Sequence, residues 1–274
     1  MTDMTLTLEL LAFLIVIGGF AGVLAGLLGV GGGIVLVPSF FFTFQMLGHD
    51  GPQTMQVCLA TSLATIVVTS LRSVVSHNRK GAVDWGILRS WAPGIVVGAV
   101  VGMLTVSSLR SMTLQMIFGV LALGVGLYMA VGKNGWRVAE EMPGGGKQYV
   151  YSPAVGFLSV LMGIGGGSFG VPLMNLHNVP IHRAVATAAG FGVLIAVPSA
   201  VGFLLLPVDP ASRPPFTIGA VNVPAFIVVI AMTLMTAPLG VRLAHAMDPA
   251  PLKRFFGLFL ILVALNMLRK AIMG

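Results

Sequence analysis

Long apolar segments recur along the whole chain and constrain its fold more than any other feature. A helix needs about twenty apolar residues to cross a bilayer, and segments of that order lie at 6–28, 54–76, 86–107, 112–132, 183–206, 218–246 and 252–272. Two further apolar segments, at 34–47 and 149–176, are short or interrupted by glycine. The pattern predicts an all-α polytopic membrane protein with about eight membrane segments.

The composition excludes several other classes of protein. Of the 274 residues, 57% are hydrophobic and only 8% are charged, whereas soluble domains carry about 25% charged residues. A soluble enzyme and a disordered chain are therefore excluded. The net charge of +7 comes from Lys and Arg residues scattered between apolar segments, so we expect the lipid bilayer and no nucleic acid as partner. The first segment reads as a membrane helix and not as a cleaved signal peptide.

An internal repeat divides the chain into two halves. Residues 22–38, GVLAGLLGVGGGIVLVP, align without a gap on residues 156–172, GFLSVLMGIGGGSFGVP, with nine of seventeen positions identical. Weaker matches pair Ala60-Thr61 with Ala186-Thr187, Gly81-Ala82-Val83-Asp84 with Gly219-Ala220-Val221-Asn222, and Phe118-Gly119 with Phe256-Gly257. A glycine-interrupted apolar segment at matching places in two halves is typical of secondary transporters and of their binding sites.

The polar stretch between the halves predicts the organisation of the chain. We expect a first transmembrane repeat at 1–132, a cytoplasmic linker at 133–148 and a second transmembrane repeat at 149–274. Basic residues cluster around the loop at 78–85 in the first half and around 242–254 in the second, which are not corresponding loops. Since basic residues favour the cytoplasmic side, this change of side favours an inverted repeat. Whether the glycine-broken segments cross the membrane or re-enter stays open.

The glycine turns are the predicted binding site. Backbone without helical hydrogen bonds is tolerated at membrane depth only inside the protein or beside a water-filled cavity. Helices that begin near Ile34 and Ser168 would present free N–H groups and a positive dipole end, which suits an anion. The alternative is that these glycines serve close helix packing alone. The candidate backbone ligands are Gly31, Gly32, Gly33, Gly165, Gly166 and Gly167.

Polar side chains near the turns complete the predicted site. All carboxylates lie at expected helix ends or loops, which argues against a buried cation cage or a carboxylate proton relay. Arg72 and Arg183 are candidates for charge compensation, with snorkelling as the alternative. Hydroxyl and amide candidates are Thr61, Ser62, Ser168, Asn175 and Thr187, although buried hydroxyls often bond to their own helix. No catalytic or metal-binding motif occurs, so we expect no enzyme activity, metal or cofactor.

Several motifs together resemble the sulfite exporter TauE/SafE family, also called the toluenesulfonate uptake permease group. They are Gly29-Val30-Gly31-Gly32-Gly33 with Val37-Pro38, Gly163-Ile164-Gly165-Gly166-Gly167 with Val171-Pro172, Ala60-Thr61-Ser62-Leu63, and Arg79-Lys80-Gly81-Ala82-Val83-Asp84-Trp85. The resemblance covers essentially the whole chain. It implies a plasma-membrane carrier, with about eight membrane segments, for small sulfur-containing anions such as sulfite, sulfonates and sulfoacetate. One departure is Ala188 after Thr187, where the first half has a serine after its threonine.

The leading functional hypothesis is alternating-access transport of such an anion, bound near the membrane midplane between the two glycine-broken segments. The membrane potential acting on an expelled anion favours export. Two alternatives remain from the sequence: a non-transporting membrane scaffold whose glycines only pack helices, and an anion channel built on the same cavity. The substrate, the coupling ion and the oligomeric state are not fixed by the sequence.

Overall fold

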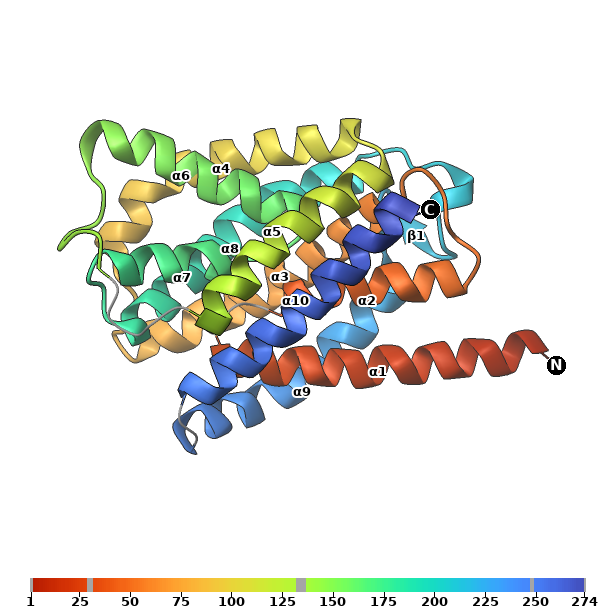
Figure 1. Ribbon diagram of the computed structural model, residues 1–274, viewed down its shortest axis with the longest axis horizontal. Helices are drawn as coiled ribbons and strands as arrows, with labels where there is room; N and C mark the ends of the chain where they lie inside the picture. The colour runs from red at the N-terminus through yellow and green to blue at the C-terminus, as the bar shows by residue number, and fades with distance from the viewer. Residues whose placement is uncertain (1, 29–31, 132–136, 247–248, 274) are drawn as a thin grey trace.

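The computed structural model describes residues 2–28, 32–131, 137–246 and 249–273, and most of them are helical (Figure 1). The helices of the first half are α1 (Thr2–Leu28), α2 (Gly33–Met46), α3 (Thr54–Arg79), α4 (Trp85–Ser108) and α5 (Ser111–Val131). The helices of the second half are α6 (Gly145–Leu161), α7 (Gly167–Leu176), α8 (Ile181–Leu204), α9 (Val223–Ala246) and α10 (Pro249–Met273).

A short irregular segment connects α8 to α9. It contains a 3-10 turn, η1 (Pro210–Ser212), and a hairpin of two strands, β1 (Thr217–Ile218) and β2 (Val221–Asn222). The strands are antiparallel, and Thr217 pairs with Asn222. The fold is thus all-α apart from this minimal hairpin, which lies at the end of the helical bundle near the C-terminus (Figure 1).

Apolar side chains face outward along the helices, as a bilayer requires. The helices α3, α4, α5 and α8, together with residues 223–240 of α9, are each long and apolar enough to cross a membrane. Side chains such as Val97, Val120 and Leu262 are 57%, 60% and 68% exposed on helix surfaces, where a soluble monomer would not place so much contiguous apolar area. The prediction of an all-α polytopic membrane protein is confirmed.

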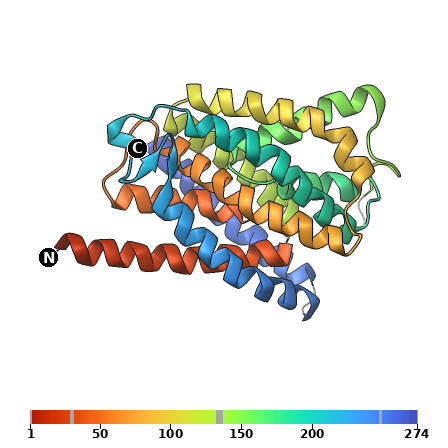
Figure 2. The same cartoon turned by 180° about the vertical axis from the view of Figure 1, so that it is seen from behind.

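At both glycine-broken segments the chain turns back toward the end of the bundle from which it came. In Figure 1, α1 runs from the N-terminal end of the bundle inward, and α2 turns back toward that same end. The helices α6 and α7 form the matching hairpin, which opens toward the opposite end, and Figure 2 shows the same arrangement from behind. The other corresponding helices also run in opposite directions, α3 against α8, α4 against α9 and α5 against α10. The favoured inverted repeat is therefore confirmed.

The two halves are interlocked through pairs of helices. The helix α1 packs on α9, α4 on α6, α3 on α8 and α5 on α10, so each pair joins one half to the other. Neither half encloses a core of its own. The bounds of the halves, 1–132 and 149–274, stay a prediction. The helix α6 begins at Gly145, inside the stretch expected to be the linker, because hydropathy detects only the apolar part of a helix.

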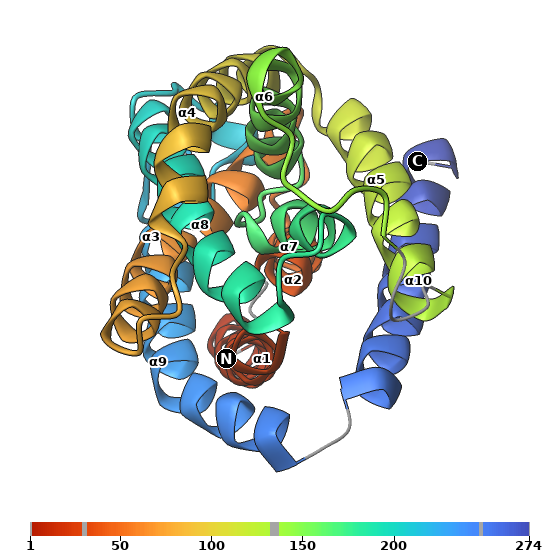
Figure 3. The ribbon, with the colours of Figure 1, turned by 90° about the vertical axis from the view of Figure 1, so that its left-hand side faces the viewer.

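The packing of the helices places the re-entrant segments in the middle of the bundle. Figure 3, which views the bundle end on, shows α5 and α10 side by side at one edge and α3, α4, α8 and α9 on the opposite side. The helices α2 and α7 lie between these groups. The two glycine turns are consequently surrounded by protein.

Candidate functional site

The two glycine turns have backbone conformations that explain their composition. Gly32, which precedes α2, has a φ of 71°, and Gly163, which follows α6, has a φ of 61°. These values lie in the left-handed region, which glycine adopts without steric cost and other residues rarely do. The chain can therefore turn sharply between α6 and α7, and again immediately before α2.

The turns touch each other at the centre of the molecule. A Cβ atom placed on Gly33 would lie 2.7 Å from the carbonyl oxygen of Gly163 and 3.1 Å from the Cα of Ile164. The Ser62 hydroxyl on α3 donates a hydrogen bond of 2.7 Å to that same Gly163 carbonyl. The backbones of the two repeats thus meet without intervening side chains, and α3 holds the contact.

The start of α7 presents hydrogen-bond donors that its own helix does not use. Gly170 N donates to Gly166 O at 2.7 Å, so the preceding N–H groups lie in the first turn, where no intrahelical acceptor exists. Ser168 is 4% exposed, and its Oγ has no hydrogen-bond partner among the described residues. A buried hydroxyl without a partner costs about 1–3 kcal/mol. The position is therefore suited to a ligand that accepts hydrogen bonds.

Ser70 is a further polar residue at this place that the sequence analysis missed. A Cβ atom on Gly192 of α8 would overlap the Ser70 hydroxyl and would lie 3.7 Å from the amide nitrogen of Gly166. Ser70 is buried on α3. The available signal was spacing, since Ser62, Ile66 and Ser70 share one face of a helix. Ile66 contacts both turns, because Cβ atoms on Gly33 and Gly165 would lie 2.9 and 3.3 Å from its side chain.

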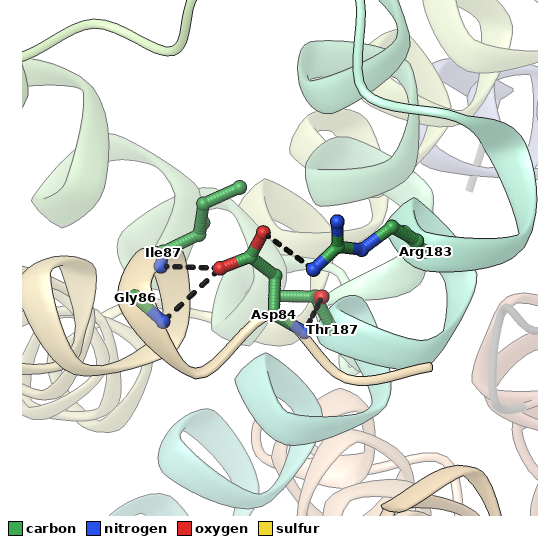
Figure 4. A network of polar contacts seen from close by, with 5 residues as sticks. All are labelled: Asp84, Gly86, Ile87, Arg183 and Thr187. Carbon is green, nitrogen blue, oxygen red and sulfur yellow. Dashed lines mark hydrogen bonds and ion pairs between the residues drawn. The ribbon is translucent and has the colours of Figure 1, made fainter. Parts of the chain in front are cut away.

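Thr61 and Thr187 make equivalent contacts between the halves. The Thr61 hydroxyl accepts a hydrogen bond of 3.0 Å from the backbone N–H of Asn222. The Thr187 hydroxyl accepts one of 2.9 Å from the backbone N–H of Asp84 (Figure 4). Both threonines were paired by the repeat, as were Asp84 and Asn222. Each threonine therefore holds the start of a helix of the other half.

Arg183 forms an ion pair at the end of the bundle. Its Nη2 lies 3.2 Å from Asp84 Oδ2, and its side chain is 53% exposed. The other Asp84 oxygen accepts hydrogen bonds from the backbone N–H groups of Gly86 and Ile87 at the start of α4 (Figure 4). Gly192 contacts the second glycine turn. Along α8, Arg183 lies about 13 Å from Gly192. The Arg183 guanidinium therefore pairs with Asp84 and does not face the glycine turns.

Two substitutions of Asp84 separate its roles. Asp84→Asn keeps an oxygen that caps α4 and loses only a half-exposed ion pair, so it is expected to lower the free energy of unfolding by about 0–1 kcal/mol. Asp84→Ala also removes the cap and is expected to cost about 0.5–2 kcal/mol more. Thermal unfolding in detergent, followed by circular dichroism, measures both. Equal losses for the two variants would contradict a capping role.

Some of the predicted site residues lie together around the turns, and the others lie elsewhere or bond between the halves. The predicted residues that meet around the turns are Gly32, Gly33, Ser62, Gly165, Gly166, Gly167 and Ser168. Gly31 lies outside the described residues. The predicted residues that lie elsewhere, or whose polar groups bond between the halves, are Thr61, Arg72, Asn175, Arg183 and Thr187. Arg72 is exposed near the end of α3, and Asn175 is half-buried near the end of α7.

The charge around the turns is set by backbone dipoles. The start of α2 at Gly33 lies against Gly163 and Ile164, three residues before α7 begins at Gly167, and helix starts carry partial positive charge. Within the part of the chain that the structure describes, no three His, Cys, Asp or Glu side chains gather as a metal site. The arrangement can hold an anion through N–H and hydroxyl donors.

Known proteins resemble the chain over nearly its whole length. The family described as "Sulfite exporter TauE/SafE" matches residues 14–267. A probable membrane transporter protein of Haemophilus influenzae is 29% identical over 256 residues, covering 93% of this chain and 97% of the relative. One of Methanocaldococcus jannaschii is 26% identical over 267 residues, covering 95% and 96%.

The probable membrane transporter protein YunE of Bacillus subtilis is 32% identical over 198 residues, covering 64% of this chain and 71% of the relative. No solved structure matches the chain significantly. The family match extends across both glycine turns and all the interlocked helix pairs. The chain therefore belongs to the sulfite exporter TauE/SafE family of membrane transporters.

Proposed function

We propose that the protein is a secondary transporter that carries small sulfur-containing anions of the sulfite, sulfonate and sulfoacetate class across the inner, plasma membrane. The observation that carries the proposal is the buried contact between the start of α2 and the turn that precedes α7, together with the Ser168 hydroxyl in the first turn of α7, which has no partner among the described residues. Family membership supports the substrate class, because the matching family is described as a sulfite exporter.

The chemistry of this meeting point suits a small oxyanion. Sulfite and sulfonate groups present several oxygens that accept hydrogen bonds at once, and first-turn N–H groups with a hydroxyl supply the donors. Arg183 is engaged with Asp84, so the negative charge of the bound ion would be balanced by the dipoles of α2 and α7. Weak, dipolar binding of this kind allows the anion to leave as well as to enter.

Burial of the turns supports alternating access. Residues 161–168 are all buried, so an anion would reach them only when surrounding helices move. The α5 and α10 pair stands at one edge of the bundle (Figure 3). We infer that this pair moves against the remaining helices and uncovers the turns first from one side and then from the other.

The distribution of basic residues gives the orientation that we propose. Of the fifteen Lys and Arg residues, Lys133 lies outside the described residues, and only Arg110, Arg213, Arg269 and Lys270 lie at the end of the bundle that holds the C-terminus. The other end carries the rest and is assigned to the cytoplasm. With the inside negative, the potential drives an expelled anion outward with about 2.3 kcal/mol per charge per 100 mV. Export is therefore the favoured direction.

Anion binding is tested by thermal stability, since a ligand specific for the folded state raises the melting temperature. Sulfite, sulfoacetate, taurine and isethionate are compared with carboxylates of matched size. Ser168→Ala removes an unpartnered hydroxyl, so the melting temperature without ligand is expected to stay the same or to rise. The apparent affinity of this variant for the sulfur anion is expected to fall about tenfold. Ser199→Ala, at a buried serine that bonds to Ile195 on α8, is the control and should retain the affinity.

Transport itself is measured with labelled anion in proteoliposomes. A carrier gives saturable uptake that accelerates in counterflow, whereas a channel gives no counterflow. Absence of flux and of any melting shift, in protein shown to be folded, would contradict the proposed function and favour a scaffold.

A further inference from the structure

A pocket lies at the end of the bundle that holds the C-terminus, away from the glycine turns. Its volume is about 560 Å³, and its wall includes residues from the start of α5, the end of α10 and the loop between α2 and α3. In Figure 1 the end of α10 that contributes to this wall carries the C-terminal label. None of the residues that meet around the turns lines it.

The wall of this pocket concentrates the positive charge of its end of the molecule. Arg110, Arg269 and Lys270 line it, and they are three of the four Lys and Arg residues described at this end. Asp50 is the single acidic side chain of the wall, so three cations and one carboxylate leave a net charge of +2. Since the cytoplasmic end attracts basic residues in general, a cluster at the opposite end calls for a specific cause.

The three cations are not neutralised by neighbouring carboxylates. Among the described residues, no Asp or Glu oxygen lies within 4 Å of their nitrogens. Lys270 donates to the neutral Gln45 side chain at 2.7 Å and lies 4.5 Å from the centre of the Phe42 ring. Among the described residues, Arg269 has one long contact of 3.4 Å, with Asn266. Their charges therefore remain available to an anion.

A neutral donor completes the wall. The Ser111 hydroxyl accepts hydrogen bonds from the backbone N–H of Met55 at 3.1 Å and from the Gln115 amide at 3.4 Å. Its own proton has no acceptor among the described residues. Ser111 is 6% exposed, so its position is fixed by the protein. A fixed donor beside three cationic side chains is the arrangement expected of an oxyanion site.

We propose that this pocket binds an anionic sulfate- or phosphate-type group, with Arg110, Arg269 and Lys270 as its cationic ligands and Ser111 as a neutral donor. The group is either a free oxyanion at the extracytoplasmic surface or the head group of an anionic lipid, since both present the same oxygens. The site is separate from the one at the glycine turns, and its existence does not depend on what the turns bind.

The test compares the wild type with the double variant Arg110→Gln/Lys270→Gln. The matched control is Arg213→Gln, which removes the fourth cation of the same end without touching the pocket. Melting temperatures are measured in neutral detergent with inorganic sulfate and inorganic phosphate, and then in nanodiscs of phosphatidylcholine with and without phosphatidylglycerol. Each lost cation is expected to weaken the apparent affinity by about tenfold.

The two sources of the anion give different results. A sulfate or phosphate shift that is lost in the double variant and kept in the Arg213→Gln control supports a free oxyanion. A shift by phosphatidylglycerol alone, lost in the same variant, supports a lipid head group. Shifts of equal size in the wild type and the double variant, or no shift in either arm, overturn the proposal, whatever the outcome for transport at the glycine turns.

Discussion

The substitution Gly33→Val is expected to lower the rate of anion transport by about tenfold to a hundredfold. A Cβ atom at this position would lie 2.7 Å from the Gly163 carbonyl oxygen and 3.1 Å from the Ile164 Cα, and both belong to the backbone of the other turn. Overpacking of this kind costs about 1–3 kcal/mol, and each 1.4 kcal/mol corresponds to a factor of ten. The strain falls on the contact between the start of α2 and the turn that precedes α7.

The initial rate of labelled sulfite or sulfoacetate flux in proteoliposomes, normalised to reconstituted protein, measures this effect. Gly124→Val is the control, because a Cβ atom on Gly124 in α5 would meet nothing within 4 Å. Size-exclusion profiles and melting temperatures establish that both variants fold. If Gly33→Val folds and transports at the wild-type rate, close approach of the turns is not needed for transport.

The sequence was sufficient to locate these turns but not to show how they meet. Hydropathy identified the helices because a membrane span leaves a long apolar run. The repeat identified the turns because glycine is required where the backbone turns sharply, as at Gly32 and Gly163. The direct contact between the turns depends on inverted halves that interlock, and such long-range pairing leaves no local pattern.

The sequence also did not show which partners the side chains of the site have. Thr61 and Thr187 were selected because they match in the repeat, and they do play equivalent parts, yet each bonds to the backbone of the other half. Arg183 was selected for its charge, but its partner Asp84 is far away in the chain. Ser70 was missed because its importance comes from Gly192 of another helix. Partners of this kind become visible only when the halves are placed together.

The substitution Gly156→Leu is expected to destabilise the folded protein strongly. A Cβ atom on Gly156 in α6 would overlap the carbonyl oxygen of Ile95 and would lie 2.9 Å from the amide nitrogen of Ala99, both in α4. Membrane helices gain their association from close packing at small residues. Because the obstructing atoms are backbone, the helices must separate, and a loss at the upper end of about 1–3 kcal/mol or more is expected.

The yield of monodisperse protein and its melting temperature in detergent measure this loss, with Gly124→Leu as the control that should leave both nearly unchanged. The repeat pairs Gly156 with Gly22, and a Cβ atom on Gly22 in α1 would lie 2.7 Å from the Thr233 Cα in α9. The two glycines thus join the halves at equivalent places, so Gly22→Leu is expected to destabilise the protein as well. If only one of the two variants loses stability, the interlocked pairs do not contribute equally to the stability of the fold.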